Sequence, residues 1–334
     1  MSLDLSPSFK RENIPVAVST FRSDGEVPVL DSQHFEGNLC YVFKVNFSDE
    51  ESWAVRIPNT TSQKPPIAYV EKEQIIIQEL NRVAFRPAPR FIGASNTFDN
   101  PVGHPFIVLS WLEGSPLTWS PTSPPRPIRD EVLREITELQ LQLIYRTSES
   151  RIATCTEWFE TVIGHRLLQV QRGELPEITI KDCFDQISFL DQVVQPRFDN
   201  LPHAMDHGFL MPHNILVDSK YKITGIVGWG LAAKVPILLA GRFPRFLQLG
   251  LSLPASQTLL QDRHVCLVTL SSHHTNIAHA MKVIQSEGDV DFRHCYLDSI
   301  ANTGTHREMA RLGWKLPLKN LGMSVVQPST EMML

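Results

Sequence analysis

Short apolar runs separated by polar turns predict β-strands in the first hundred or so residues. LCYVFKVNF (39–47) and SWAVRIP (52–58) are rich in aromatic and β-branched residues, and the SDEE between them is typical of a turn. The two runs therefore predict a β-hairpin. A further buried strand is expected in HPFIVLSWLEG (104–114), which ends at a glycine turn.

Apolar residues at helical spacing follow the hairpin and dominate the rest of the chain. In IAYVEKEQIIIQELNRV (67–83) they predict an amphipathic helix, with apolar positions at Val70, Ile75, Ile76, Ile77 and Leu80. SPTSPPRPIRD (120–130) has four prolines in eleven residues, so we expect a loop there, with Asp130 as the N-cap of the next helix. Further helical patterns lie around 131–147, 156–172, 181–195 and up to about 313, and a strand is expected at 222–229.

Composition indicates a soluble globular protein. A length of 334 residues is enough for two lobes, and a hydrophobic share of 42% is enough for a sizeable core. A formal charge of −5 argues against binding to nucleic acid or to acidic membranes. The most apolar segment, 235–254, contains Arg242, Arg245 and three prolines, so no membrane-spanning helix is expected. Five scattered cysteines without C-x-x-C, and no signal-peptide core in MSLDLSPSFKRENIP, predict a cytoplasmic location.

Three stretches in a fixed order carry a family resemblance: SWAVRIP, GHPFIVLSWLEGSPL and HGFLMPHNILVDSKYKITGIVGW. Together they resemble the aminoglycoside phosphotransferase and choline kinase-like family, especially its fungal members, over roughly residues 34–240. The resemblance implies an α+β, protein-kinase-like fold with two lobes. Residues 1–115 would form a small β-rich N-terminal lobe with the hairpin and a helix. Residues 116–334 would form a larger helical C-terminal lobe that carries the catalytic loop.

The resemblance also implies where a nucleotide would bind. Arg56 of AVRIP takes the position of the strand residue that holds phosphates, and Glu73 takes that of its acidic partner on the helix. The alternative for Arg56 and Glu73 is a surface ion pair on an edge hairpin. The hinge-like run FIVLSWLEG, which contains Glu113, would face the adenine ring, although a plain buried strand explains the run equally well. The expected phosphate-covering loop offers only Gly37.

The catalytic positions depart from the family pattern. The family motif H-G-D-x-x-x-x-N is matched by His207, Gly208 and Asn214, but Phe209 stands where the base would be. Loss of a general base costs a factor of about 10² to 10⁴ in rate. The family's I-D-W-E reads V-G-W-G here, so Gly228 stands at the metal-ligand position and Gly230 at the next acid. Because Mg²⁺ prefers oxygen ligands, we expect no metal site there.

Three nearby residues are candidates to replace the missing base. Asp206 precedes His207 and is expected to face away, and Asp218 is better explained as a turn residue. His213 is the best candidate because a neutral imidazole can accept a proton near pH 7, although a solvated loop histidine is the simpler interpretation.

The leading hypothesis is a degenerate family member, a pseudokinase or repurposed protein that binds a small molecule in the cleft between the lobes. The motivating observation is the joint loss of acids at Phe209, Gly228 and Gly230. No cofactor is expected, and by family analogy a biosynthetic role in secondary metabolism is one option. The first alternative is an active small-molecule phosphotransferase that uses ATP and Mg²⁺ with Arg56, Asn214 and His213. The second alternative is a protein-interaction scaffold, for which the sequence has no distinguishing feature.

Overall fold

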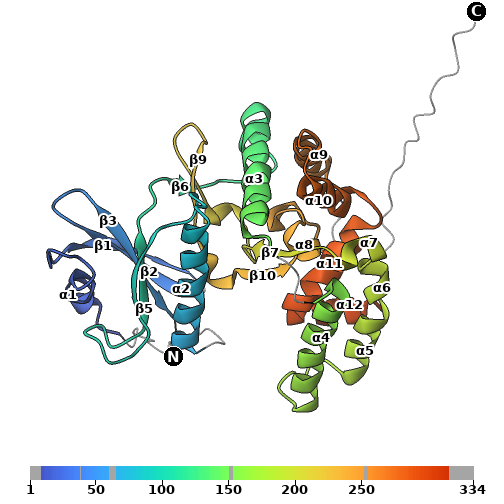
Figure 1. Cartoon of the computed structure of the whole chain (residues 1–334), viewed down its shortest axis with the longest axis horizontal. Helices are drawn as coiled ribbons and strands as arrows, with labels where there is room; N and C mark the ends of the chain where they lie inside the picture. Colours follow the sequence, from blue (N-terminus) through green and yellow to red (C-terminus); the bar gives the residue numbers. More distant parts are fainter. Residues whose placement is uncertain (1–8, 38, 60–64, 150–152, 252–254, 316–334) are drawn as a thin grey trace, which may run out of the picture.

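The chain forms two lobes, a sheet with packed helices and a larger helical body (Figure 1). The structure is a computed structural model that describes residues 9–37, 39–59, 65–149, 153–251 and 255–315. The first eight residues of the segment expected to lack a signal-peptide core lie outside the described residues. The start of the expected N-terminal lobe and the end of the expected C-terminal lobe also lie outside them. The α+β, kinase-like fold class predicted from the sequence is confirmed by this architecture.

The N-terminal lobe is built on a five-stranded antiparallel sheet with the order β1-β2-β3-β5-β4. Its strands are β1 (Val29–Glu36), β2 (Cys40–Asn46), β3 (Ser52–Pro58), β4 (Phe91–Ser95) and β5 (Phe106–Ser110). The β2–β3 pairing confirms the predicted hairpin, and β5 confirms the predicted buried strand. Strands β1 and β4, at the two edges, were not expected. β1 is mostly exposed, so its sequence lacks the apolar alternation that marks a half-buried strand.

Helix α2 (Pro66–Arg82) confirms the predicted amphipathic helix and links the two lobes. Val70, Ile77 and Leu80 are fully buried, whereas Ile75 is exposed. The helix contacts β4 and β5 of its own lobe and the turn Trp229–Leu231 of the C-terminal lobe. A shorter helix, α1 (Ile14–Ser19), precedes the sheet.

The C-terminal lobe consists mainly of helices. They are α3 (Arg126–Thr147), α4 (Cys155–Gln171), α5 (Ile180–Ser188), α6 (Leu190–Val193), α7 (Pro196–Asp199), α8 (Ile237–Ala240), α9 (Gln257–Ser271), α10 (Asn276–Ser286), α11 (Val290–Ala301) and α12 (Thr303–Arg311). Two small sheets position the loops between these helices: β10 (Ala233–Pro236) with β7 (His203–Asp206), and β6 (Ser115–Pro116) with β8 (Ile215–Val217) and β9 (Ile223–Ile226).

The start of α3 corrects one expectation. The helix begins at Arg126, so the last five residues of the expected loop are helical, and Asp130 lies inside the helix and is not its N-cap. Proline is tolerated in a first helical turn because its missing N–H has no helical partner there, so Pro127 does not delay the helix. Asp130 instead forms an ion pair with Arg126, which also reaches Asp262 of α9 at 2.7 Å.

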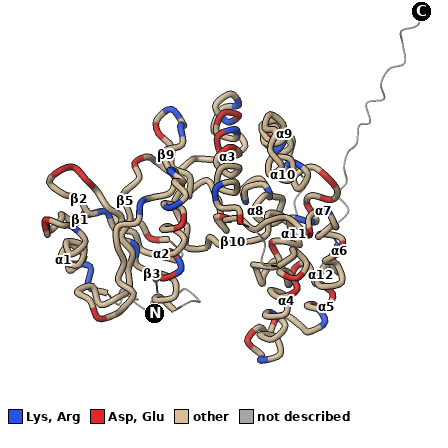
Figure 2. Tube along the Cα trace, in the orientation of Figure 1, with Lys and Arg blue, Asp and Glu red and all other residues tan. Residues whose placement is uncertain are grey.

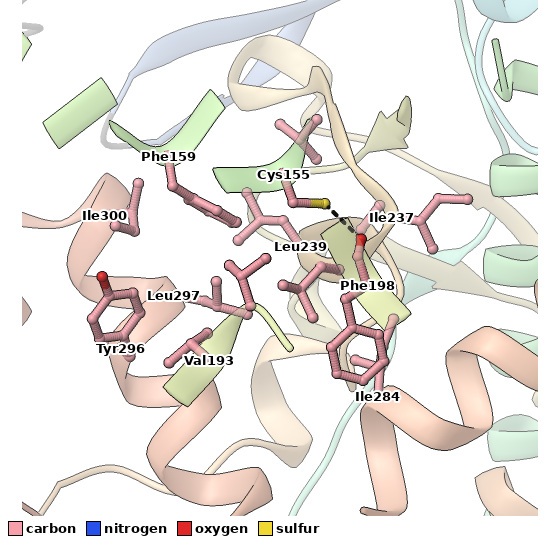
Figure 3. Packing of buried hydrophobic residues seen from close by; sticks show 14 of the residues in the cluster. Cys155, Phe159, Val193, Phe198, Ile237, Leu239, Ile284, Tyr296, Leu297 and Ile300 are labelled. Atoms are coloured by element: carbon pink, nitrogen blue, oxygen red, sulfur yellow. Dashed lines mark hydrogen bonds between the residues drawn. The ribbon is translucent and has the colours of Figure 1, made fainter. Parts of the chain in front are cut away.

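The core of the C-terminal lobe is a large apolar cluster contributed by helices far apart in the sequence (Figure 3). Phe159 of α4 and Tyr296 and Leu297 of α11 are fully buried in it. The Cys155 thiol donates a hydrogen bond to the carbonyl oxygen of Phe198 at 3.0 Å. All five cysteines are buried.

Charged residues of both signs are interspersed over the two lobes, as Figure 2 shows along the backbone trace. Within the described ranges, no helix has the length and apolar character needed to cross a membrane.

Candidate functional site

The loop that follows β7 carries His207, Gly208, Phe209 and Asn214 and is held by buried contacts of His207. The His207 side chain is 3% exposed, its Nε2 lies 2.9 Å from the carbonyl oxygen of Val227, and its ring lies 4.6 Å from that of Trp229. Burial lowers the pKa of His207 to about 4, so the ring is neutral near pH 7. A neutral ring that donates from Nε2 leaves Nδ1 to accept the backbone N–H of Phe209, 3.4 Å away. His207 therefore fixes the loop by hydrogen bonds.

Gly208 brings this loop against the segment that follows Gly228. Its φ is +80°, and a β-carbon at this position would lie 2.4 Å from the carbonyl oxygen of Leu231. Both the left-handed conformation and the close approach require glycine.

The side chains of Phe209 and Asn214 define the open side of the loop. Phe209 is 38% exposed, and its ring centroid lies 6.2 Å from that of His213, which is exposed. The Asn214 amide donates from Nδ2 to the carbonyl oxygen of Phe209 at 2.8 Å. The structure thus brings the three loop candidates Phe209, His213 and Asn214 together.

The two glycines of V-G-W-G lie against side chains from other segments. Gly228 has a φ of +86°, and a β-carbon there would lie 2.8 Å from Asn214 Oδ1. At Gly230 a β-carbon would lie only 1.8 Å from the hydroxyl oxygen of Tyr69, which comes from α2. The hydroxyl group of Tyr69 therefore occupies the space in which a side chain at position 230 would begin.

Arg56 and Glu73 form a buried ion pair, with Arg56 Nε 3.0 Å from Glu73 Oε1 and side-chain exposures of 13% and 1%. The alternative of a surface pair on an edge hairpin is wrong, because β3 lies between β2 and β5 in the sheet. Burial acts to lower the pKa of Arg56, but the charge of Glu73 outweighs it and the pKa is raised. Arg56 is therefore a fixed cation at this place.

Tyr69 and Cys40 complete this buried cluster and were missed in the sequence analysis. Arg56 Nη2 lies 3.8 Å from the Cys40 sulfur, and burial raises the pKa of the Cys40 thiol to about 11. Tyr69 precedes Glu73 by four residues, so both lie on the same face of α2. That spacing was the available signal for Tyr69, whereas nothing local marked Cys40.

Glu113 is placed apart from this cluster. Its side chain is 80% exposed and lies 3.4 Å from Lys44 Nζ, while its backbone carbonyl accepts a hydrogen bond from the hydroxyl group of Thr224 at 2.6 Å. Any contact from this segment to an adenine ring would come from the backbone.

Asp218 and Asp206 differ in their surroundings. Asp218 accepts the backbone N–H groups of Lys220 and Lys222 at 2.8 and 2.9 Å, as expected for a turn residue. Asp206, at the end of β7, lines a cavity behind the loop, and burial raises the pKa of its carboxyl group. Among the residues described, no group of three or more His, Cys, Asp or Glu side chains is arranged to hold a metal ion.

Comparison with known proteins supports the fold. No protein-family model matches the chain. No curated protein matches it in sequence. Solved structures do match: a candidate aminoglycoside phosphotransferase from Ralstonia eutropha has a TM-score of 0.54 at 16% identity, over 92% of this chain and 97% of that one. Ethanolamine kinase from Plasmodium vivax has a TM-score of 0.55 at 13% identity, over 85% and 82%. The streptomycin–ATP–APH(2")-IIa ternary complex has a TM-score of 0.52 at 12% identity, over 85% and 89%.

These matches define the class of fold. The chain has the kinase-like fold of aminoglycoside phosphotransferases and ethanolamine kinase, as the sequence resemblance predicted. At identities of 12% to 16% the likeness concerns the fold alone.

Proposed function

We propose that this chain is a kinase-like protein that has lost phosphoryl transfer and binds a small molecule in the cleft between its lobes. The observation that carries the proposal is the contact between Tyr69 and Gly230. The space that a carboxylate side chain would need at position 230 is filled by the Tyr69 hydroxyl group, 1.8 Å from the β-carbon position. Because the Tyr69 side chain fills the space of the acid expected at position 230, the site is adapted to a residue without a side chain there.

The residues at this site do not fit a magnesium ion. Of Phe209, Asn214, Gly228 and Gly230, only Asn214 has a side-chain oxygen, and its Nδ2 is bonded to the loop carbonyl of Phe209. Mg²⁺ demands near-octahedral oxygen coordination and usually takes carboxylates from proteins. Phosphoryl transfer depends on a metal that bridges the phosphates, so this donor set favours its loss.

No neighbouring side chain among the described residues places a proton acceptor at position 209, where the family motif has its general base. Phe209 offers no proton acceptor, and the ring of His213 lies to its side with a centroid separation of 6.2 Å. In the alternative in which the protein is active, a substrate hydroxyl would have to reach His213 at the exposed edge of the loop. The geometry therefore favours binding over general-base chemistry.

The ligand we expect has an apolar part. Phe209 and Leu231 are 38% and 40% exposed, and Leu231 contacts the glycine that precedes Phe209. Phe209, at a position where the family motif has a carboxylate, and the nearby Leu231 would then present apolar side chains to a ligand. Among the structural relatives, APH(2")-IIa is known in a complex with streptomycin and ATP, so the fold accommodates small molecules. A fungal-type, biosynthetic role would agree with an apolar ligand and rests on family analogy.

Isothermal titration with ATP, with and without Mg²⁺, tests the proposal directly. We expect no magnesium-dependent binding at micromolar ATP. Magnesium-dependent micromolar binding, with phosphorylation of a hydroxyl- or amino-bearing acceptor, would overturn the proposal.

One observation favours the alternative of an active phosphotransferase. The Arg56–Glu73 ion pair is retained at 3.0 Å, and this pair would hold nucleotide phosphates in an active kinase-like enzyme. If Arg56→Met abolishes ATP binding seen in the titration, the nucleotide site is functional. If ATP does not bind the wild-type protein, the ion pair has only a structural role.

A further inference from the structure

A small cavity lies behind the catalytic-loop segment, between α3 and the segment 239–248. We call it the Arg242 cavity; its walls include Gln140, Asp206, His207, Trp229, Arg242 and Arg245. Its volume is about 50 Å³. One water molecule needs about 10–15 Å³ by this measure, so the cavity has room for a few waters or for one small charged group.

The cavity has an unpaired cationic group in its wall. Arg242 donates from Nε to the carbonyl oxygen of Leu239 at 2.9 Å, but its Nη1 is buried without a hydrogen-bond partner. Buried donors almost always have a partner, from the protein, water or a ligand. An unpaired guanidinium nitrogen beside a cavity therefore indicates that something else accepts its hydrogen bond.

The acids of the described chain do not meet this need. Asp206 is close enough to interact electrostatically with Arg242, but the two form no ion pair. The neighbouring Arg245 is bound to Asp298, with Arg245 Nη2 2.9 Å from Asp298 Oδ2. Among the described residues, no carboxylate thus pairs with Nη1 of Arg242.

The backbone around Arg242 is held in place from α3. Gln140 donates from Nε2 to the carbonyl oxygens of Ala240 and Arg242 at 2.8 and 2.7 Å. Gln248 donates in the same way to the carbonyl oxygen of Phe243 at 2.6 Å. The held backbone and the Nε hydrogen bond to Leu239 limit how far the Arg242 side chain must rearrange when a ligand binds.

We propose that the Arg242 cavity binds an oxyanion, the carboxylate or phosphate group of a small molecule, with Arg242 as the donor. A guanidinium group presents planar donors that match the oxygens of a carboxylate or a phosphate. The cavity is too small for a whole nucleotide and takes one such group. The site does not depend on the proposed function, because nucleotide binding at Arg56 would leave it unchanged.

Binding of inorganic phosphate and of acetate to the full chain tests this site. Each anion is titrated at constant ionic strength against chloride, with ligand-observed NMR and the thermal unfolding temperature as readouts. We expect saturable binding of at least one anion, and the one that binds more tightly identifies the group. Phosphate also stabilises proteins by exclusion from their surface, but that effect does not saturate.

Two variants distinguish anion binding at Arg242 from a non-specific effect of the anions on the protein. Arg242→Met should raise the dissociation constant at least about tenfold, because a charge-assisted hydrogen bond is lost. Arg166→Met removes a buried arginine elsewhere, in α4, and should keep wild-type affinity. If Arg242→Met does not fold, Arg242→Lys keeps the charge but loses the planar fork, and it should bind measurably more weakly than wild type. The absence of saturable binding in wild type, or equal affinity in wild type and the Arg242 variant, would overturn the proposal.

Discussion

The hydroxyl oxygen of Tyr69 lies 1.8 Å from the point at which a side chain at Gly230 would begin. The two residues come from different lobes, one from α2 and the other from the turn after β9. Their contact joins the buried cluster around Arg56 to the segment that carries Gly228. At this contact between the lobes, position 230 therefore has to be glycine for the structure to pack as it does.

We expect Gly230→Ala to destabilise the protein by about 1–3 kcal/mol, because the added methyl group overpacks a filled space. Urea unfolding measures the change. Gly164→Ala is the control: nothing lies within 4 Å of a β-carbon there, and alanine in a helix should be neutral or stabilising. In the double variant Tyr69→Leu with Gly230→Ala, part of the loss should be recovered. Strictly additive effects of the two changes would show that the residues are not coupled.

Restoring two acids should restore metal-dependent nucleotide binding if the scaffold is otherwise competent. A side chain at Gly228 is strained by the left-handed backbone, whose φ is +86°. Asp is among the residues that tolerate this conformation best, so Gly228→Asp carries less strain than most substitutions there. The new side chain would displace the Asn214 amide from its bond to the Phe209 carbonyl. We expect Phe209→Asp with Gly228→Asp to bind ATP only when Mg²⁺ is present.

The matched control for this restoration is Phe209→Asn with Gly228→Asn, which has nearly the same shape without the charges. It should give no magnesium-dependent heat in the same titration. A magnesium effect of equal size in both double variants would mean that charge at these positions does not determine metal binding.

Removing one partner of the buried Arg56–Glu73 ion pair should destabilise the protein. We expect Arg56→Met or Glu73→Gln to lower the free energy of unfolding by about 3–5 kcal/mol, because the remaining group stays buried without compensation. Replacing both, as Arg56→Met with Glu73→Leu, should cost much less than the sum. Chemical denaturation of the three variants gives the coupling energy, and a coupling near zero would contradict a buried pair.

Stability should decrease with acid because of His207. Burial lowers the pKa of this residue to about 4 from 6.5. Between these values the unfolded chain binds a proton that the folded chain does not, so the free energy of unfolding falls as the pH falls from 6.5 to about 4. The contribution is about 3 kcal/mol over that window and is constant outside it.

The variant His207→Gln tests this pH dependence, with the free energy of unfolding measured at several pH values. It should be less stable than wild type at pH 7 and should lose less stability on acidification to pH 4. Other buried histidines, such as His306, titrate in the same direction, so the slope should become smaller without vanishing. An unchanged difference between the two proteins at every pH would exclude His207 as the source.

The elements with a clear period could be predicted from the sequence, whereas those defined by distant pairing could not. The hairpin β2–β3 and helix α2 have enough apolar positions in a regular pattern to be recognised locally. Strands β7 and β10 have four residues each and pair across a long stretch of chain, so no local period reveals them. The start of α3 was misjudged because prolines indicate a loop in general but are allowed in a first helical turn.

In the candidate site, too, some features could be predicted from the sequence and others could not. Motif spacing identified the residues of the loop, and the structure brings Phe209, His213 and Asn214 together as that spacing implied. The contact of Tyr69 with Gly230 spans two lobes and has no signature in either segment. Arg242 was noticed only as a charge that interrupts an apolar segment, and its unpaired nitrogen depends on which groups the fold places around it.

Gly208 has a consequence for how such a protein can change over generations. Because Gly208 lies against main-chain atoms of Leu231, this close approach does not depend on which side chain stands at position 209. A substitution at position 209 can then be inherited and alter what the cleft recognises, while this contact between the two segments is passed on intact. A change in what position 209 presents to the cleft need not compete with folding in a lineage built this way.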